Sequence, residues 1–142
     1  KSSIIGIDIN KKNIIIANEL LDKINLKNVK FIYGDINNQT DINAEYVILS
    51  NILEHIENRT KFLRNIQKIS NSKIFLIRVP NFERDWQIAM RKELGIYYFS
   101  DVDHKIEHTV QQLKKDIEKA GFTIKEIITV WGEIWATCEY GI

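Results

Sequence analysis

Two aspartates that follow short apolar runs are the residues of this sequence best suited to binding chemistry. Asp8 ends the apolar run 4–7, and Asp35 follows the run 29–34, with a helix-like segment between them. A carboxylate at the carboxyl end of a parallel strand points into the crevice where open α/β sheets bind ligands. Two such acids on successive strands suit a nucleoside, since one can accept hydrogen bonds from ribose hydroxyls while the other lies near the base.

Histidines supply the candidate groups for proton transfer. His55 follows Glu54 after an apolar run, and His104 and His108 precede a predicted helix. An imidazole with an ordinary pKa of about 6.5 can take a proton at neutral pH. The acidic stretch 101–103 could supply an acid that orients His104. We predict His104 and His55 as catalytic residues. The competing interpretation of His104 and His108 is that they are solvated histidines of a loop.

Apolar runs and helical periodicity alternate along the chain and predict the elements that position these residues. We expect strands over 3–8, 29–33, 44–49 and 73–79, and helices over about 10–24, 58–70, 83–94 and 109–120. Residues 122–130 and 134–140 predict two closing strands joined as a hairpin at 131–133. The alternation predicts an α/β fold with a mostly parallel sheet, helices on both faces, and a C-terminal antiparallel hairpin that adds an antiparallel strand to the sheet edge.

Composition restricts the class of protein. The chain has 142 residues and a net charge of +1, so it has no strong electrostatic attraction to nucleic acid or anionic membrane. A single cysteine, Cys138, fits a reducing compartment. No apolar run reaches the roughly 18 residues of a membrane span, and the first residues do not read as a secretory signal. We expect a cytoplasmic protein without membrane or nucleic-acid partners, and the oligomeric state stays open.

Several stretches, taken in order, resemble class I S-adenosylmethionine-dependent methyltransferases. Residues 5–10 are similar to the second-strand motif of that family, 33–36 to the end of its third strand, and 46–55 to its fourth-strand motif with a Leu-Glu-His turn. Residues 103–109 and 120–122 resemble its late segment, in which an acid-histidine stretch leads into a helix ending Ala-Gly-Phe. The resemblance implies a Rossmann-like fold over nearly the whole chain and S-adenosylmethionine as cofactor.

The resemblance also implies cofactor roles for strand-end residues. Asp8 would bind the ribose diol, and Asp35 would approach the adenine amino group. Ile9 and Ile36 would form the two apolar walls of the adenine site. The implied cofactor-binding residues are Asp8, Ile9, Gly34, Asp35, Ile36, Ser50 and Asn51, the last two beside the methionine portion. Competing interpretations are a turn or cap for the polar residues and plain core packing for the isoleucines.

The chain departs from the family pattern in two places. No glycine-rich turn precedes Asp8, so the family's first strand and glycine-rich loop are missing. We therefore expect residues 1–142 to be a single methyltransferase-like domain truncated at its N-terminus. Some relatives bind a divalent cation with a glutamate three residues before the Glu-His pair. Asn51 stands at that position, and we expect no metal.

The predicted function is methyl transfer from S-adenosylmethionine to an oxygen or nitrogen of a small-molecule acceptor. Aromatic and apolar residues in 86–99 could cover a flat or apolar acceptor, although an amphipathic helix packing on the sheet would explain them equally well. Two alternatives stay open. One is a non-catalytic α/β binding or regulatory module, and the other is an NAD-binding oxidoreductase domain, because a strand-end acid also suits an NAD ribose.

Overall fold

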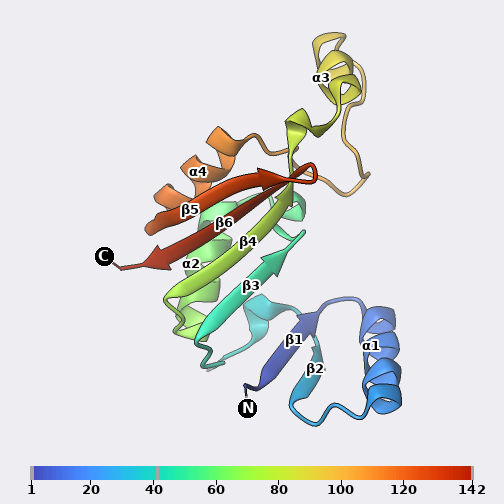
Figure 1. The fold of residues 1–142 in the computed structure, drawn as a ribbon, viewed down its shortest axis with the longest axis vertical. Coiled ribbons are helices and arrows are strands. Elements are labelled where there is room, and N and C mark those ends of the chain that lie inside the picture. The colour runs from blue at the N-terminus through green and yellow to red at the C-terminus, as the bar shows by residue number, and fades with distance from the viewer. Residues whose placement is uncertain (1, 41, 142) are drawn as a thin grey trace. The chain divides into compact units, whose positions relative to one another are not determined.

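The first of two compact units in the chain is a β-α-β arrangement. The computed structural model (Figure 1) describes residues 2–40, which belong to the first unit, and residues 42–141, which belong to the second. The elements of the first unit are β1 (Ile4–Asp8), α1 (Lys11–Ile24), β2 (Val29–Tyr33) and a 3-10 turn, η1 (Ile36–Asn38). These agree closely with the ranges predicted from sequence.

Parallel pairing brings the carboxyl ends of β1 and β2 together. The strands pair in register with Asp8 opposite Tyr33, and the backbone N–H of Gly34 donates to the Asp8 carbonyl oxygen at 3.0 Å. The side chain of Asn10 caps α1 by accepting from the backbone N–H of Lys12. The short connections on either side of α1 therefore place the two strand-end acids at one edge of this unit.

The second unit contains a four-stranded sheet in the order β3-β4-β6-β5. Its strands are β3 (Tyr46–Ser50), β4 (Ile74–Pro80), β5 (Phe122–Val130) and β6 (Glu133–Tyr140). β3 and β4 are parallel, and β6 runs antiparallel to both of its neighbours. The predicted C-terminal hairpin is confirmed.

The hairpin extends the sheet next to the parallel pair β3-β4. Its second strand, β6, pairs antiparallel with β4 and lies between β4 and β5, so β5 is one of the two edge strands. The reason for this order lies in side-chain burial. β6 contributes the buried residues Ile134, Ala136 and Cys138, whereas Phe122 is the buried apolar residue of β5. A strand with a row of buried residues is stabilised most in the interior of a sheet.

Two helices of the second unit, α2 (Arg59–Ser70) and α4 (Val110–Lys119), lie on the same side of its sheet (Figure 1). The core there contains Phe62, Leu63 and Ile66 of α2, Leu113 and Ile117 of α4, and Phe75, Ile77 and Val79 of β4. The predicted capping box is present at Thr109 and Gln112. Among the described residues, no helix has both the length and the apolar character of a membrane span.

The predicted helix over 83–94 is interrupted. Its first part is a 3-10 turn, η3 (Phe82–Arg84), and Asp85 then adopts an extended conformation with a φ of −140°. Its side chain accepts from the backbone N–H of Gln87 and so begins the separate helix α3 (Trp86–Glu93). Periodicity does not reveal this break, because an aspartate cap interrupts the backbone without disturbing the apolar spacing.

Gly6 is required by the close approach of Phe31. A Cβ atom built on Gly6 would lie 2.5 Å from Cδ1 of the Phe31 ring. We predict that Gly6→Ala lowers the free energy of unfolding by about 1–3 kcal/mol, the usual cost of overpacking. Urea denaturation followed by circular dichroism measures this. Phe31→Leu should recover part of the loss in the double variant, and an unchanged unfolding midpoint for Gly6→Ala would show that the ring moves aside freely.

Candidate functional site

Asp8 ends β1 as a half-buried carboxylate. Its Oδ1 accepts from the backbone N–H of Asn10 at 2.7 Å, and its Oδ2 accepts from Nδ2 of Asn13 at 2.9 Å. Each carboxylate oxygen can accept more than one hydrogen bond, so Asp8 retains capacity for an external hydroxyl. A hollow of about 170 Å³ is lined by Gly6, Ile7, Asp8, Asn13, Ile14, Ala17 and Phe31.

Asp35 lies beside the end of β2 and is exposed. Its Oδ1 accepts from the backbone N–H and from Nδ2 of Asn37, at 2.8 and 2.9 Å, so it caps η1 as the turn interpretation expects. Gly34 has a φ of 156°, which disfavours other residues. Ile9 is 70% exposed, which excludes core packing for it within this unit, while Ile36 is half-buried. The hollow beside Asp8 does not include Asp35 among its lining residues.

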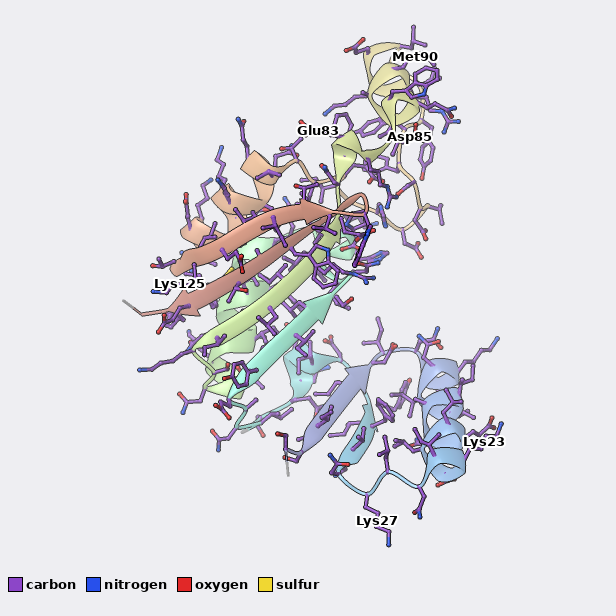
Figure 2. The ribbon with its side chains drawn as sticks, in the orientation of Figure 1. Lys23, Lys27, Glu83, Asp85, Met90 and Lys125 are labelled. Atoms are coloured by element: carbon purple, nitrogen blue, oxygen red, sulfur yellow. The ribbon has the colours of Figure 1, made fainter. Side chains whose placement is uncertain are left out.

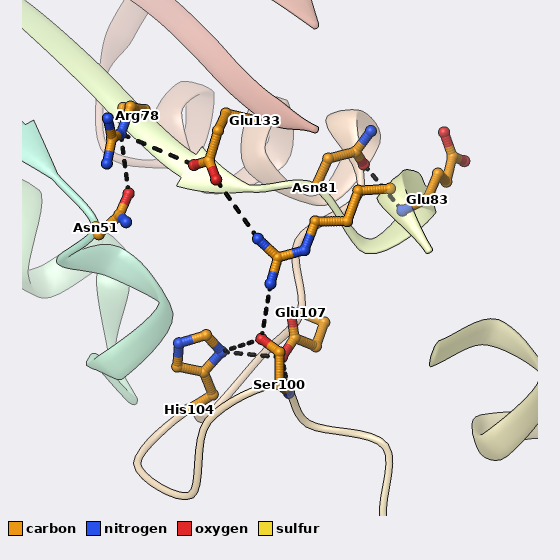
Figure 3. A network of polar contacts seen from close by, with 9 residues as sticks. Asn51, Arg78, Asn81, Glu83, Ser100, His104, Glu107 and Glu133 are labelled. Atoms are coloured by element: carbon orange, nitrogen blue, oxygen red, sulfur yellow. Dashed lines mark hydrogen bonds and ion pairs between the residues drawn. The ribbon is translucent and has the colours of Figure 1, made fainter. Parts of the chain in front are cut away.

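Ser50 and Asn51 follow in the second unit, at the end of β3. Ser50 is exposed, and Asn51 adopts a left-handed conformation with a φ of 53°. Its Oδ1 accepts from Nε of Arg78 at 3.1 Å, and its backbone N–H donates to the Arg78 carbonyl oxygen at 2.9 Å (Figure 3). Asn51 does not cap the next turn, since Ile52 is the cap residue of η2 (Leu53–His55). Arg78 was not predicted from the sequence as a site residue. The feature that could have indicated it is a charged side chain within an otherwise apolar strand.

The structure brings His55, His104 and Glu54 together. The two imidazole rings meet edge to face with their centroids 4.9 Å apart. Glu54 is buried, and its Oε2 has no hydrogen-bond partner among the described residues. Burial raises the pKa of the Glu54 carboxyl, and a backbone hydrogen bond and the nearby histidines only partly oppose this. One ligand atom from each of the three residues lies within 4.8 Å of the others. The expectation of no metal stays a prediction.

His104 has a different acidic partner from the one expected. Its Nδ1 lies 2.9 Å from Oε1 of Glu107, whereas Oδ1 of Asp101 accepts from the backbone N–H of Asp103. The same Oε1 accepts from the backbone N–H and the hydroxyl of Ser100, at 2.6 and 2.8 Å. Burial alone would raise the pKa of Glu107, but these hydrogen bonds outweigh it and hold that pKa below its usual value.

Polar contacts connect this histidine with the β5–β6 hairpin. Nη2 of Arg84 donates to Oγ of Ser100 at 3.0 Å, and Nη1 of Arg84 donates to Oε1 of Glu133 at 3.4 Å (Figure 3). Oε2 of Glu133 lies 3.8 Å from Nε of Arg78. The predicted residues Asn51 and His104 therefore stand at two ends of one polar network in the second unit.

His108 is fully buried, so the interpretation as a solvated loop histidine is wrong. Its backbone forms a bridge with Asn81 at the end of β4, which carries the side chain into the core. Neither ring nitrogen has a hydrogen-bond partner among the described residues, and Nε2 is 4.0 Å from Oδ2 of Asp116. Burial, reinforced by the Arg59 charge, lowers the pKa of His108 to about 4.

The buried histidine predicts a loss of stability in acid. The pKa of His108 is about 4 in the folded chain and 6.5 in its ordinary state, so the unfolded chain binds the proton more readily between these values. The contribution of His108 to the free energy of unfolding is fully present above pH 6.5. It falls by about 3 kcal/mol as the pH approaches 4. Denaturant unfolding at pH 7 and pH 4 should show this loss in the wild type. This loss of unfolding free energy should be absent in His108→Gln and retained in the control His55→Gln. An equal pH dependence of the wild type and both variants would contradict the assignment of the loss to His108.

The segment predicted to cover an acceptor is largely exposed. Trp86 at the start of α3 is 69% exposed. Met90 of the same helix, labelled in Figure 2, is 42% exposed. Within that helix Ile88 is the buried residue, so packing against the sheet does not explain the other apolar side chains. Tyr98 stacks on Phe99 at a centroid separation of 4.5 Å. The acceptor-covering role stays a prediction.

Comparison with known proteins bears on the family and on the fold of the chain. Residues 1–135 match the model of a family described as Methyltransferase domain. No curated protein matches the sequence. The fold is similar to that of a small RNA methyltransferase, with 20% identity, a TM-score of 0.78, and coverage of 98% of this chain and 20% of that one.

Two further solved structures share the fold. Magnesium protoporphyrin IX methyltransferase from Synechocystis PCC 6803, solved with bound S-adenosylhomocysteine, has 13% identity, a TM-score of 0.73, and coverage of 98% of this chain and 64% of that one. An O-methyltransferase from neocarzinostatin biosynthesis, solved with S-adenosylhomocysteine and a dihydroxynaphthoic acid, has 14% identity, a TM-score of 0.74, and coverage of 98% and 42%. The chain thus spans less than two thirds of all three proteins.

Proposed function

The chain belongs to the methyltransferase domain family, whose methyl donor is S-adenosylmethionine, and from this premise we propose that it methylates an oxygen or nitrogen of a small-molecule acceptor. The observation that carries the proposal is the in-register parallel pairing that sets Asp8 and Asp35 at adjacent strand ends. The similarity to the naphthoic acid-bound O-methyltransferase supports a small acceptor.

The strand-end residues fit the chemistry of the donor's nucleoside. We propose that Asp8 accepts from the ribose hydroxyls with the lone pairs that its asparagine partners leave, and that Asp35 accepts from the adenine amino group. Ile9 offers an exposed apolar surface for the flat base. We propose that Ile36 forms the other wall of the adenine and that Gly34 also contacts the cofactor. Because the Asn51 oxygen accepts from Arg78, its amide nitrogen remains to donate to a carboxylate, together with the Ser50 hydroxyl.

The proposed base is His104, with His55 beside it. The bound donor supplies an electrophilic methyl group, so the protein must hold the acceptor in line and remove its proton if the pKa of that proton is high. His104 is held through Nδ1 and touches the His55 ring at its edge. A general base so placed contributes typically a factor of about 10²–10⁴ in rate.

A second candidate function is a metal-assisted form of the same transfer. It is favoured by the buried Glu54, whose Oε2 has no partner among the described residues, next to two imidazoles. A divalent cation held there would polarise an acceptor hydroxyl. The neutral Asn51, which accepts from a guanidinium, weighs against it.

Metal dependence separates the two candidates. If methyl transfer uses His104 as base and no metal, we predict that EDTA leaves turnover unchanged. Millimolar Mn²⁺ or Mg²⁺ should likewise leave the melting temperature of the full-length protein unchanged. Glu54→Gln is the test variant and Glu57→Gln is the nearby exposed control. Activity lost to EDTA and restored by Mn²⁺, with a cation-dependent rise in melting temperature that Glu54→Gln abolishes, would establish the second candidate.

Removal of one strand-end carboxylate tests the cofactor assignment. We predict that Asp8→Ala in the full-length protein weakens S-adenosylmethionine binding by about 1–3 kcal/mol, the cost of lost charge-assisted hydrogen bonds. Isothermal titration calorimetry measures this, and Asp22→Ala on the exposed side of α1 is the matched control. Equal affinities of wild type and Asp8→Ala would refute the assignment.

The same calorimetry addresses the alternatives. Selective binding of NAD in place of S-adenosylmethionine would favour an oxidoreductase domain. Binding of the donor without turnover on any hydroxyl or amine acceptor would favour a non-catalytic module. Turnover on RNA and on no small molecule would overturn the proposed acceptor class, while leaving methyl transfer in place.

A further inference from the structure

We propose that Glu107 is a positioning residue that fixes His104 in the tautomer with its proton on Nδ1, so that Nε2 is the basic nitrogen. This inference rests on the proposed function, in which His104 is the base. Glu107 forms no described hydrogen bond to the predicted cofactor residues or to His55, so its proposed effect on the reaction passes through His104.

The contact between Nδ1 of His104 and Oε1 of Glu107 decides which ring nitrogen carries the proton. The two atoms are 2.9 Å apart, a normal hydrogen-bond distance. An ionised carboxylate can only accept, so the hydrogen must reside on Nδ1. In a neutral imidazole the other nitrogen then carries the lone pair. The only tautomer of neutral His104 compatible with an ionised Glu107 therefore has Nε2 as its proton acceptor.

The hydrogen bonds around Glu107 favour the ionised form of its carboxyl. Its side chain is 0% exposed, yet Oε1 collects donors from the Ser100 backbone, the Ser100 hydroxyl and His104. All three donors lie within hydrogen-bond distance of this one oxygen, and donors gathered around a carboxylate stabilise its ionised form. A buried carboxylate with several donors is also fixed in orientation, because each lost hydrogen bond would leave a buried polar group unpaired.

The orientation of the His104 ring directs Nδ1 toward Glu107. In Figure 3 the Nδ1 edge of His104 faces Ser100 and Glu107, and the opposite edge points away from both. Outside this contact the ring lies against His55 and close to Glu54. Proton uptake at Nε2 would create an imidazolium that Glu107 stabilises from the far side. Glu107 thus makes Nε2 the nitrogen of His104 that accepts the proton, and it stabilises the positive charge of the imidazolium that forms.

A purely structural role is the competing explanation, because Glu107 also anchors Ser100, which Arg84 contacts in turn. The two roles differ in what Glu107→Gln should do. Glutamine keeps an oxygen that can accept from Ser100, but it can turn either its oxygen or its NH₂ group toward Nδ1. A positioning role predicts that the tautomer preference of His104 weakens while the fold is retained.

Nitrogen-15 NMR of the histidine rings reads the tautomer without any need for activity. In full-length wild type, His104 should show a protonated Nδ1 and an unprotonated Nε2. Glu107→Gln should give a mixture or the opposite tautomer, and the exposed control Glu118→Gln should match the wild type. A wild-type His104 protonated on Nε2, or a spectrum unchanged by Glu107→Gln, would overturn the positioning role whatever the enzyme's activity.

A double-variant cycle then tests the link to turnover. Glu107→Gln should lower kcat about tenfold, leave the KM for the methyl donor unchanged, and cost nothing further in a His104→Ala background. An equal cost in both backgrounds, or a raised KM with unchanged kcat, would overturn the inference. If His104→Ala alone leaves kcat unchanged, the proposed base fails, while the NMR result still stands on its own.

Discussion

In-register parallel pairing of short strands is the constraint on which the rest of the structure depends. In the first unit it sets Asp8 opposite Tyr33, so that Asp35 follows at the same edge. In the second unit it sets Ser50 opposite Arg78, and the next residue, Asn51, bonds to that arginine. Parallel strands end on the same side, and polar residues that cannot enter the apolar core collect there. Both predicted groups of cofactor residues owe their positions to this rule.

Two buried glutamates of the second unit show how local donors decide the state of a carboxyl. Oε2 has no hydrogen-bond partner among the described residues in either glutamate. Oε1 of Glu107 accepts three hydrogen bonds, and the pKa of that carboxyl is lowered, whereas burial raises the pKa of the Glu54 carboxyl. His104 lies between them. Environments that push the pKa values of neighbouring acids apart are typical of sites where protons move. The contrast therefore supports assigning proton transfer to this side of the second unit.

Much of the fold was predictable, because apolar periodicity and caps depend on near neighbours in sequence. The strands, α1, α2, α4 and the C-terminal hairpin follow from such local signals. The placement of β6 between β4 and β5 does not, since it depends on burial across the sheet. The site divides in the same way: strand-end residues such as Asp8 were predictable, but the partnership of His104 with Glu107 and the burial of His108 arise from tertiary contacts.

The central claim is that the carboxylates of Asp8 and Asp35 hold the nucleoside of the methyl donor. A crystal structure of the full-length protein with S-adenosylhomocysteine would test it most directly. We expect the ribose hydroxyls within hydrogen-bond distance of Asp8 and the adenine amino group within hydrogen-bond distance of Asp35. A nucleoside bound elsewhere, with both carboxylates still bonded only to their neighbouring asparagines, would contradict the claim.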